Sequence, residues 1–282
     1  MAEAMYQPHF GLREPPFGIT PDTSFAFECR GHQEALNVVL VALESGEGFI
    51  KITGDVGTGK TLLCRRVLAS LGNDYATAYL PNPLLDSRGL MLALADEFGV
   101  EIAVNIEGHQ LVRALTQALL RLNLAGRRPV VFIDEAQAMA LPTLEALRLL
   151  SNLETEKHKL LQVVLFGQPE LDRHLAAPSV RQLRQRITFE YRIEALTLRE
   201  LRHYLAHRLQ VAGYSGGHVF SAPAAWYLFR ATRGVPRLVN ILAHKALILA
   251  YAEGTDHVGL RQACLAARDT ASARRALIPW VV

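Results

Sequence analysis

The chain has 282 residues, and 50% of them are hydrophobic, so it can bury a full α/β core and still supply a second, smaller domain. The formal net charge is +3, but residues 1–150 carry 12 Lys and Arg against 17 Asp and Glu, whereas residues 151–282 carry 18 against 10. The basic C-terminal half is compatible with a nucleic-acid partner. Solvated helix faces and nucleotide pockets are also basic, so nucleic acid is not the favoured partner.

The ends of the chain and its cysteines indicate the compartment. No apolar run reaches the roughly 20 residues that a membrane span needs, so we expect no direct membrane insertion. The N-terminus lacks the basic and apolar segments of a secretory signal, which favours a cytoplasmic protein. Cys29, Cys64 and Cys264 lie far apart without pairing or ligand spacing, which is typical of buried thiols in a reducing compartment.

The first two thirds of the chain alternate strand and helix signals. Apolar runs bounded by turn residues predict strands at residues 49–53, 75–80, 130–133, 160–166 and 187–193. Helical spacing predicts helices at 61–71, 87–98, 109–124 and 141–153, with an exposed loop at 99–108. This alternation is typical of a doubly wound parallel sheet. The last strand alternates apolar and polar residues, as an edge strand does.

Beyond about Ala195 the strand signals stop. Helices are expected at 198–211, 222–232, 236–252 and 257–273. Ser221 is suited to cap the second of these helices, and Pro236 fits the first turn of the third. The chain therefore divides into an α/β domain over residues 1–195 and a helical domain over residues 196–282.

A phosphate-binding motif lies between the first predicted strand and the first predicted helix. It matches G-x-x-x-x-G-K-[ST] in full, and its predicted nucleotide-binding residues are Gly54, Asp55, Val56, Gly57, Thr58, Gly59, Lys60, Thr61 and Leu62. The glycines let backbone N–H groups turn toward phosphate oxygens. Lys60 supplies a positive charge for the β and γ phosphates of ATP, and Thr61 a hydroxyl ligand for Mg²⁺. The alternative is a glycine-rich turn with a chance lysine.

An acidic pair follows the apolar strand at 130–133. Because ligands bind outside the carboxyl ends of parallel strands, Asp134 and Glu135 should face the phosphates. Asp134 is expected to hold Mg²⁺ through water, and Glu135 to act as the general base on the attacking water. Such pairs also cap helices, but the phosphate loop favours the functional interpretation. A glutamate directly after the magnesium aspartate indicates a hydrolase over a small-molecule kinase.

Further polar residues are expected to complete the site. Gln168 follows the fourth strand and either contacts the γ phosphate or the attacking water, or caps a helix beginning near Pro169. Arg237, in the helical domain, and Arg184 or Arg186, ahead of the last strand, are candidates to stabilise charge on the transferred phosphoryl group. A single arginine is more often a solvated surface residue. The aromatic residues of the N-terminus are either core residues or pack over an adenine.

The motifs resemble the ExeA family of AAA+ ATPases over nearly the whole chain. The resemblance rests on residues 5–17, 53–61, 134–137, 145–154, 167–171, 183–187 and 234–240. It implies a P-loop NTPase of the AAA+ fold, with a parallel five-stranded sheet flanked by helices, a C-terminal all-helical lid and residues 1–30 as a linker over the adenine. It also implies Walker A and B roles for the loop and the acidic pair, and sensor roles for Gln168 and Arg237. Arg184 or Arg186 would then be the finger that acts on a neighbouring subunit.

The resemblance also implies a function. The chain would hydrolyse ATP with Mg²⁺ in a homo-oligomer to drive or regulate assembly of an MSHA-type type IV pilus or a related secretion machinery. ExeA carries a membrane anchor and a peptidoglycan-binding region after its ATPase part, whereas this sequence ends at Val282. We therefore expect pilus or secretion proteins as partners, reached through an inner-membrane protein. The alternative is a nucleotide-switched scaffold or a DNA-targeting module with little intrinsic turnover.

Overall fold

The computed structural model describes residues 6–20, 22–103, 106–151 and 159–274, which form two compact units. The sheet unit comprises Arg30–Gly54 and Leu63–Ile193. The helical unit comprises Met1–Cys29, Asp55–Leu62 and Glu194–Val282. The last of these three segments begins two residues before residue 196, the predicted start of the helical domain. The N-terminal residues and the phosphate loop, assigned from the sequence to the α/β domain, group with the C-terminal helices.

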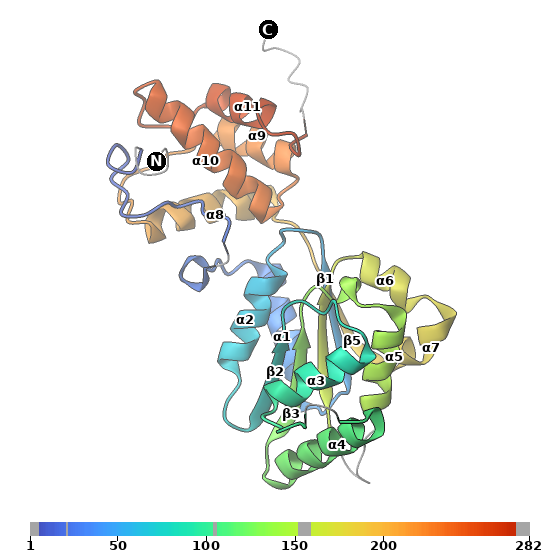
Figure 1. Cartoon of the computed structure of the whole chain (residues 1–282). Helices are drawn as coiled ribbons and strands as arrows, with labels where there is room; N and C mark the ends of the chain where they lie inside the picture. The colour runs from blue at the N-terminus through green and yellow to red at the C-terminus, as the bar shows by residue number, and fades with distance from the viewer. Residues whose placement is uncertain (1–5, 21, 104–105, 152–158, 275–282) are drawn as a thin grey trace. The chain divides into compact units, whose positions relative to one another are not determined.

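The sheet is parallel and has the strand order β2-β3-β4-β1-β5 (Figure 1). Its strands are β1 (Phe49–Gly54), β2 (Tyr75–Leu80), β3 (Arg128–Ile133), β4 (Gln162–Gly167) and β5 (Ile187–Ile193). The five predicted strands are confirmed, although β3 starts two residues earlier and β4 two residues later than expected. β5 lies at an edge and its residues alternate in exposure, as its sequence predicted. The carboxyl ends of β3, β4 and β1 lie side by side.

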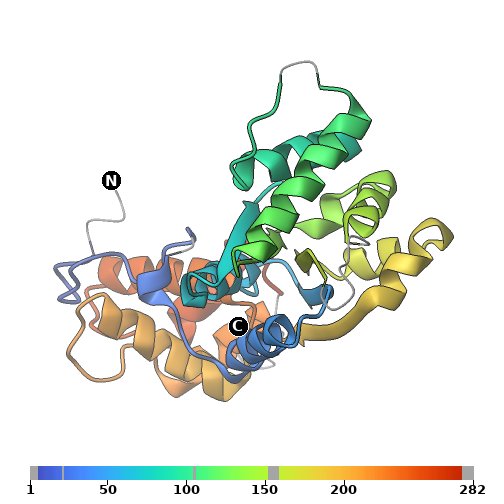
Figure 2. The same cartoon turned by 90° about the horizontal axis from the view of Figure 1, so that it is seen from below.

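Helices cover both faces of the sheet (Figure 1 and Figure 2). On one face, α1 (Arg30–Glu44) and the apolar residues of α2 (Lys60–Ser70) pack on Ile52, Phe132 and Phe166. The other face is covered by α3 (Ser87–Glu97), α4 (Gly108–Leu124), α5 (Leu141–Leu150), α6 (Glu170–Leu175) and α7 (Arg181–Arg186). α1 was not predicted. α5 ends before the predicted residue 153, and residues 152–158 lie outside the described part.

The helical unit contains α8 (Leu198–Val211), α9 (Ala222–Thr232), α10 (Pro236–Ala252) and α11 (Leu260–Arg268). The first three have their predicted bounds, whereas α11 is shorter than 257–273. α8 begins with a capping box in which the Thr197 side chain accepts from the Glu200 N–H and the Glu200 side chain accepts from the Thr197 N–H. Ser221 caps α9 and Pro236 opens α10, both as predicted. Within the described ranges, no helix is long and apolar enough to cross a membrane.

The N-terminal segment packs into the core of the helical unit. Tyr6 and Phe17 are buried against residues of α8, α9 and α10. The buried Arg208 of α8 donates to the carbonyl oxygens of Pro16, at 2.5 Å, and Gly18, at 3.2 Å. Its guanidinium also lies 4.5 Å from the centroid of the Phe25 ring. These aromatic residues are therefore core residues of the helical unit.

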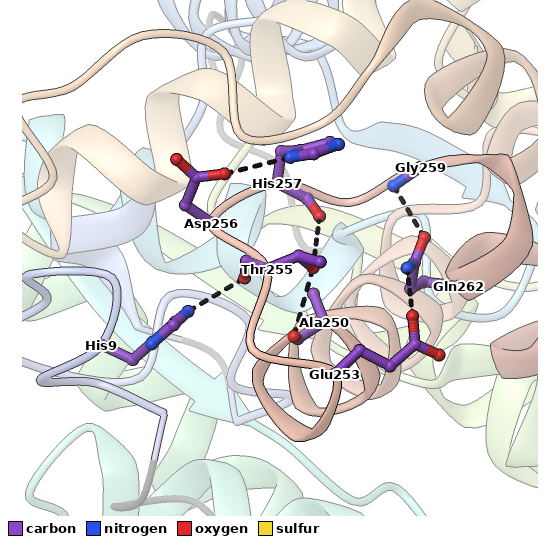
Figure 3. Close-up of polar contacts among 8 residues, drawn as sticks. All are labelled: His9, Ala250, Glu253, Thr255, Asp256, His257, Gly259 and Gln262. Atoms are coloured by element: carbon purple, nitrogen blue, oxygen red, sulfur yellow. Dashed lines mark hydrogen bonds and ion pairs between the residues drawn. The ribbon is translucent and has the colours of Figure 1, made fainter.

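A second attachment joins the N-terminal segment to the turn between α10 and α11 (Figure 3). The His9 Nε2 donates to the carbonyl oxygen of Thr255 at 2.9 Å. The Thr255 hydroxyl lies 3.2 Å from the carbonyl oxygen of Ala250 and 3.1 Å from that of His257, which closes the turn. Gln262 accepts from the Gly259 N–H at 2.9 Å. The hydrogen bonds therefore fix the turn that leads into α11.

The three cysteines are buried, and none of them forms a disulfide. Burial raises the pKa of the Cys64 thiol far above its ordinary value, and burial also raises the pKa of Cys264. All three thiols are thus kept from solvent and two are held protonated, in agreement with the prediction of buried thiols.

Gly234 offers a test of the helical unit. Its φ is +76°, and a Cβ there would lie 2.0 Å from the carbonyl oxygen of Leu196. Gly234→Ala therefore combines backbone strain with a backbone clash, and we expect it to lower the free energy of unfolding by about 2–4 kcal/mol in chemical denaturation. The matched control is Gly254→Ala, where φ is +68° but a Cβ would meet nothing within 4 Å. Equal losses for the two variants would contradict a role for the Leu196 contact.

Candidate nucleotide site

The phosphate loop leaves β1 at Gly54 and enters α2 at Lys60. Gly57 and Gly59 have φ values of +81° and +94°, a conformation that residues with a Cβ rarely adopt. The Thr58 hydroxyl donates to the carbonyl oxygen of Asp55 at 2.8 Å, and the Lys60 ammonium donates to the same oxygen at 2.9 Å. Lys60 is only 5% exposed. The loop thus folds tightly around a buried positive charge, as a phosphate cradle does.

The loop also contacts the start of α10 within the helical unit. The Arg237 N–H donates to the carbonyl oxygen of Gly57 at 3.2 Å. A Cβ on Gly57 would lie 2.6 Å from the Arg237 Cβ and 3.3 Å from the Val235 Cγ1. Only glycine at position 57 allows this approach. The structure therefore brings Arg237, predicted as the lid arginine, next to the phosphate loop.

The other predicted loop residues differ in exposure. Asp55 and Val56 are exposed, whereas Thr61 and Leu62, in the first turn of α2, are half-buried. An exposed stretch followed by a buried lysine fits a polyphosphate that enters from solvent and ends on the ammonium group.

The acidic pair stands at the carboxyl end of β3. Asp134 is 2% exposed, and its Oδ1 accepts from the Glu135 N–H at 2.9 Å. Glu135 is half-buried and has a φ of +52°. A non-glycine residue in this left-handed conformation costs about 1 kcal/mol or more, and such strain gathers at functional sites. A buried aspartate with a second, strained acid beside it fits a site for Mg²⁺ and an activated water.

Gln168, at the carboxyl end of the neighbouring strand β4, reaches this acid. Its Nε2 donates to the Glu135 Oε2 at 3.1 Å. The next helix, α6, takes Pro169 as its N-cap residue and has no side-chain capping hydrogen bond. The alternative that Gln168 caps this helix is therefore not observed. The fold brings together an acid and an amide that lie 33 residues apart in the sequence.

One residue of this group was not predicted. The Gln137 Nε2 donates to the same Glu135 Oε2 at 2.5 Å, and its Oε1 accepts from the Gln168 N–H at 2.9 Å. The sequence feature that could have indicated Gln137 as a site residue is its position, a polar side chain two residues after the acidic pair in an otherwise apolar turn. That signal alone does not distinguish a site residue from a surface residue.

The two candidate finger arginines lie on α7 but differ in surroundings. The half-buried Arg186 donates to the Ser151 hydroxyl at 3.2 Å. Arg184 is exposed, and its guanidinium makes no hydrogen bond or ion pair with a described residue. It lines a cavity of about 450 Å³ together with Lys51, Asp172 and Glu190. Of the two candidate arginines, Arg184 is thus the one whose side chain is available to a neighbouring subunit.

The Lys51 ammonium forms ion pairs with two carboxylates that line this cavity. It lies 2.6 Å from the Asp172 carboxylate of α6 and 2.7 Å from the Glu190 carboxylate of β5. Burial opposes the charged form, but the two carboxylates outweigh it and raise the pKa of Lys51. The acids beside Arg184 are therefore already paired with another cation.

Comparison with known proteins agrees with this geometry. Residues 43–175 match the AAA domain family. Over 271 residues the chain is 42% identical to General secretion pathway protein A of Aeromonas hydrophila. The matched segment covers 96% of this chain and 49% of that protein. The chain thus spans about half the length of this relative. It contains an AAA domain and is similar to a secretion-pathway protein, as the resemblance to the ExeA family implied.

Solved structures show the same fold at low identity. Cdc6p of Pyrobaculum aerophilum has a TM-score of 0.67 at 16% identity, covering 88% of this chain and 70% of that one. An ORC2 protein of Aeropyrum pernix has a TM-score of 0.62 at 19% identity, covering 89% and 72%. RuvB of Thermotoga maritima has a TM-score of 0.59 at 16% identity, covering 89% and 73%. The predicted AAA+ fold, with its five-stranded parallel sheet and C-terminal helices, is confirmed.

Proposed function

We propose that this chain, an AAA-domain homologue of General secretion pathway protein A, binds and hydrolyses Mg-ATP within a homo-oligomer. The observation that carries the proposal is the Glu135 carboxylate, which is held by the Gln168 amide at the carboxyl ends of adjoining strands. A general base must be aimed at its water before the reaction begins. An acid that only capped a helix would not require an amide from the next strand.

The residues divide the chemistry among them. The backbone of the phosphate loop and the Lys60 ammonium bind and orient the phosphates. Thr61, and Asp134 through water, would hold Mg²⁺, and the ion would supply positive charge to the phosphate oxygens. Glu135 accepts a proton from the attacking water as that water bonds to the γ phosphorus and the bond to the ADP oxygen breaks. Gln168 keeps the Glu135 carboxylate in place and senses the γ phosphate.

The arginines stabilise the charge that develops on the transferred group. Arg237 acts from the lid, and its backbone contact with Gly57 supports a position near the phosphates. Arg184 acts on the nucleotide of a neighbouring subunit, which makes hydrolysis depend on assembly. Its exposure and lack of a described partner support this assignment over Arg186.

The cellular task is a further part of the proposal. The similarity to General secretion pathway protein A supports a role in assembling or regulating a secretion machinery. Within that class, the sequence motifs favour a protein like MshM, which is associated with biogenesis of the mannose-sensitive haemagglutinin pilus. In this role the chain works in the cytoplasm and contacts the inner membrane through a partner protein.

A second candidate function has one observation in its favour. Residues 151–282 carry 18 basic against 10 acidic residues, a balance that suits a DNA-targeting AAA+ module. Such a module would bind duplex DNA more tightly with ATP and lose affinity steeply with added salt, because phosphate contacts release counterions. It would also hydrolyse ATP slowly in the absence of DNA.

Steady-state hydrolysis over a range of protein concentrations tests the main proposal. We expect activity per subunit to rise with concentration, in parallel with an ATP-dependent increase in mass measured by light scattering, and to disappear when EDTA removes Mg²⁺. The same activity per subunit from monomers and oligomers would contradict an active site completed by a neighbour. ATP binding without hydrolysis at any concentration would favour the DNA-targeting or scaffold function.

A further inference from the structure

Gln137 uses both ends of its side-chain amide. The donor end, Nε2, meets the Glu135 carboxylate at 2.5 Å, and the acceptor end, Oε1, meets the Gln168 N–H at 2.9 Å. A flipped amide would place its oxygen against a carboxylate oxygen and its NH₂ group against an N–H group. Only one orientation of the amide is therefore compatible with both neighbours. Gln137 connects the end of β3 to the end of β4.

The sheet leaves room for this amide through a glycine. A Cβ on Gly167, the last residue of β4, would lie 3.3 Å from the Gln137 Oε1 and 2.8 Å from the Leu171 Cδ2. A side chain there would press on α6 on one side and on the amide on the other. The missing side chain at Gly167 lets Gln137 approach the β4 backbone closely enough to bond it.

The bonds of Gln137 act on the orientation of the Glu135 carboxylate. Gln137 and Gln168 both donate to Oε2 of Glu135, and Oε1 accepts no hydrogen bond from a described residue. The last torsion of a glutamate is soft, so a carboxylate held by one donor still rotates. Two donors on one oxygen fix the plane of the group and direct the other oxygen away from them. That second oxygen is the one that can accept a proton from water.

We propose that Gln137 is a positioning residue for ATP hydrolysis, which aims the Glu135 carboxylate and couples it to the β4 end that carries Gln168. This inference rests on the proposed function, in which Glu135 is the general base. Gln137 touches no reacting atom, so its effect belongs to the catalytic step and leaves nucleotide binding unchanged. A nucleotide that pulls Gln168 toward its γ phosphate would move the Gln137 amide with it.

The test compares Gln137→Met, which keeps the size of the side chain but removes both hydrogen bonds, with Gln117→Met on the exposed face of α4. We expect Gln137→Met to lower kcat by about 10- to 100-fold. Its KM and its affinity for a fluorescent ATP analogue should stay within about twofold of wild type, and the Gln117→Met control should match wild type throughout. Gln137→Glu keeps an acceptor for the Gln168 N–H but sets a carboxylate against Glu135, and we expect a loss at least as large.

A double-mutant cycle separates positioning from a general structural role. In a Glu135→Gln background, single-turnover hydrolysis should fall less than about twofold on adding Gln137→Met, because the base that it orients is already gone. An equal fractional loss in both backgrounds, or a drop in thermal stability beyond that of Gln117→Met, would overturn the inference.

The two proposals fail in different ways. If wild type hydrolyses ATP, Glu135→Gln lowers hydrolysis by about 100-fold or more and Gln137→Met turns over like the control, only the positioning role is wrong. If wild type does not hydrolyse ATP, or Glu135→Gln leaves the rate unchanged, the proposed function is wrong and the role of Gln137 is overturned with it.

Discussion

Replacing Glu135 by glutamine is expected to lower kcat for ATP hydrolysis by about 100-fold or more, while the affinity for ATP changes by less than about threefold. The amide has the size of the carboxylate but cannot accept the proton of the attacking water. The groups that we propose to bind the phosphates, which include the Lys60 ammonium, are left intact. Steady-state kinetics together with equilibrium binding of a fluorescent ATP analogue would measure both quantities.

The matched control is Glu101→Gln, on the exposed loop after α3. It makes the same chemical change away from the sheet ends and should hydrolyse ATP like wild type. Because the Glu135→Gln variant binds ATP without cleaving it, we also expect it to accumulate as the ATP-bound oligomer. A variant that loses affinity and keeps its kcat would assign Glu135 to ground-state binding and remove it as the base.

Much of the fold could be predicted because its signals are local. Strands that are buried on both faces of a parallel sheet form continuous apolar runs, and β3 and β4 were predicted from such runs. The starts of α9 and α10 were predicted to the residue because Ser221 and Pro236 each mark a helix start.

α1 was not predicted because it has no local signal at its start. The residue before it is Cys29, which is not a capping residue, and Gly31 lies in its first turn. Its apolar residues, such as Ala35, Val39 and Leu43, follow helical spacing but have no start signal. α1 packs against β1 and β5. Such tertiary contacts cannot be predicted from local sequence signals.

The candidate site likewise combines local motifs, which the sequence predicts, with contacts between distant residues, which it does not. The phosphate loop and the acidic pair were identified from spacing within a few residues. The Gln137 amide bonds a backbone N–H that is 31 residues away in the sequence, and the pair meets only because β3 and β4 are neighbours in register. Likewise, the contact of Arg237 with Gly57 depends on how the helical unit folds around the loop. Sequence motifs identified the candidate site residues, and the strand order decides which of Glu135, Gln137 and Gln168 touch.

Replacing Arg184 by alanine is expected to lower kcat about 1,000-fold in the assembled protein, with little change in the free energy of unfolding. The side chain is exposed and bonds no described residue, so its removal leaves the subunit intact. Arg186→Ala should instead lower stability by about 1 kcal/mol, because it removes the hydrogen bond to the buried Ser151 hydroxyl. Arg181→Ala, at the exposed start of α7, serves as the control for a lost surface charge.

Mixing variants tests whether Arg184 acts on a neighbour. An Arg184→Ala subunit keeps its own base, and a Glu135→Gln subunit keeps its own finger, so each alone is inactive. In a mixed oligomer, some sites combine the intact Glu135 of one subunit with the intact Arg184 of the next. If the finger acts between subunits, hydrolysis therefore returns on mixing and reaches its maximum near equal amounts. If Arg184 acts within its own subunit, every site still lacks one group and no ratio restores the activity.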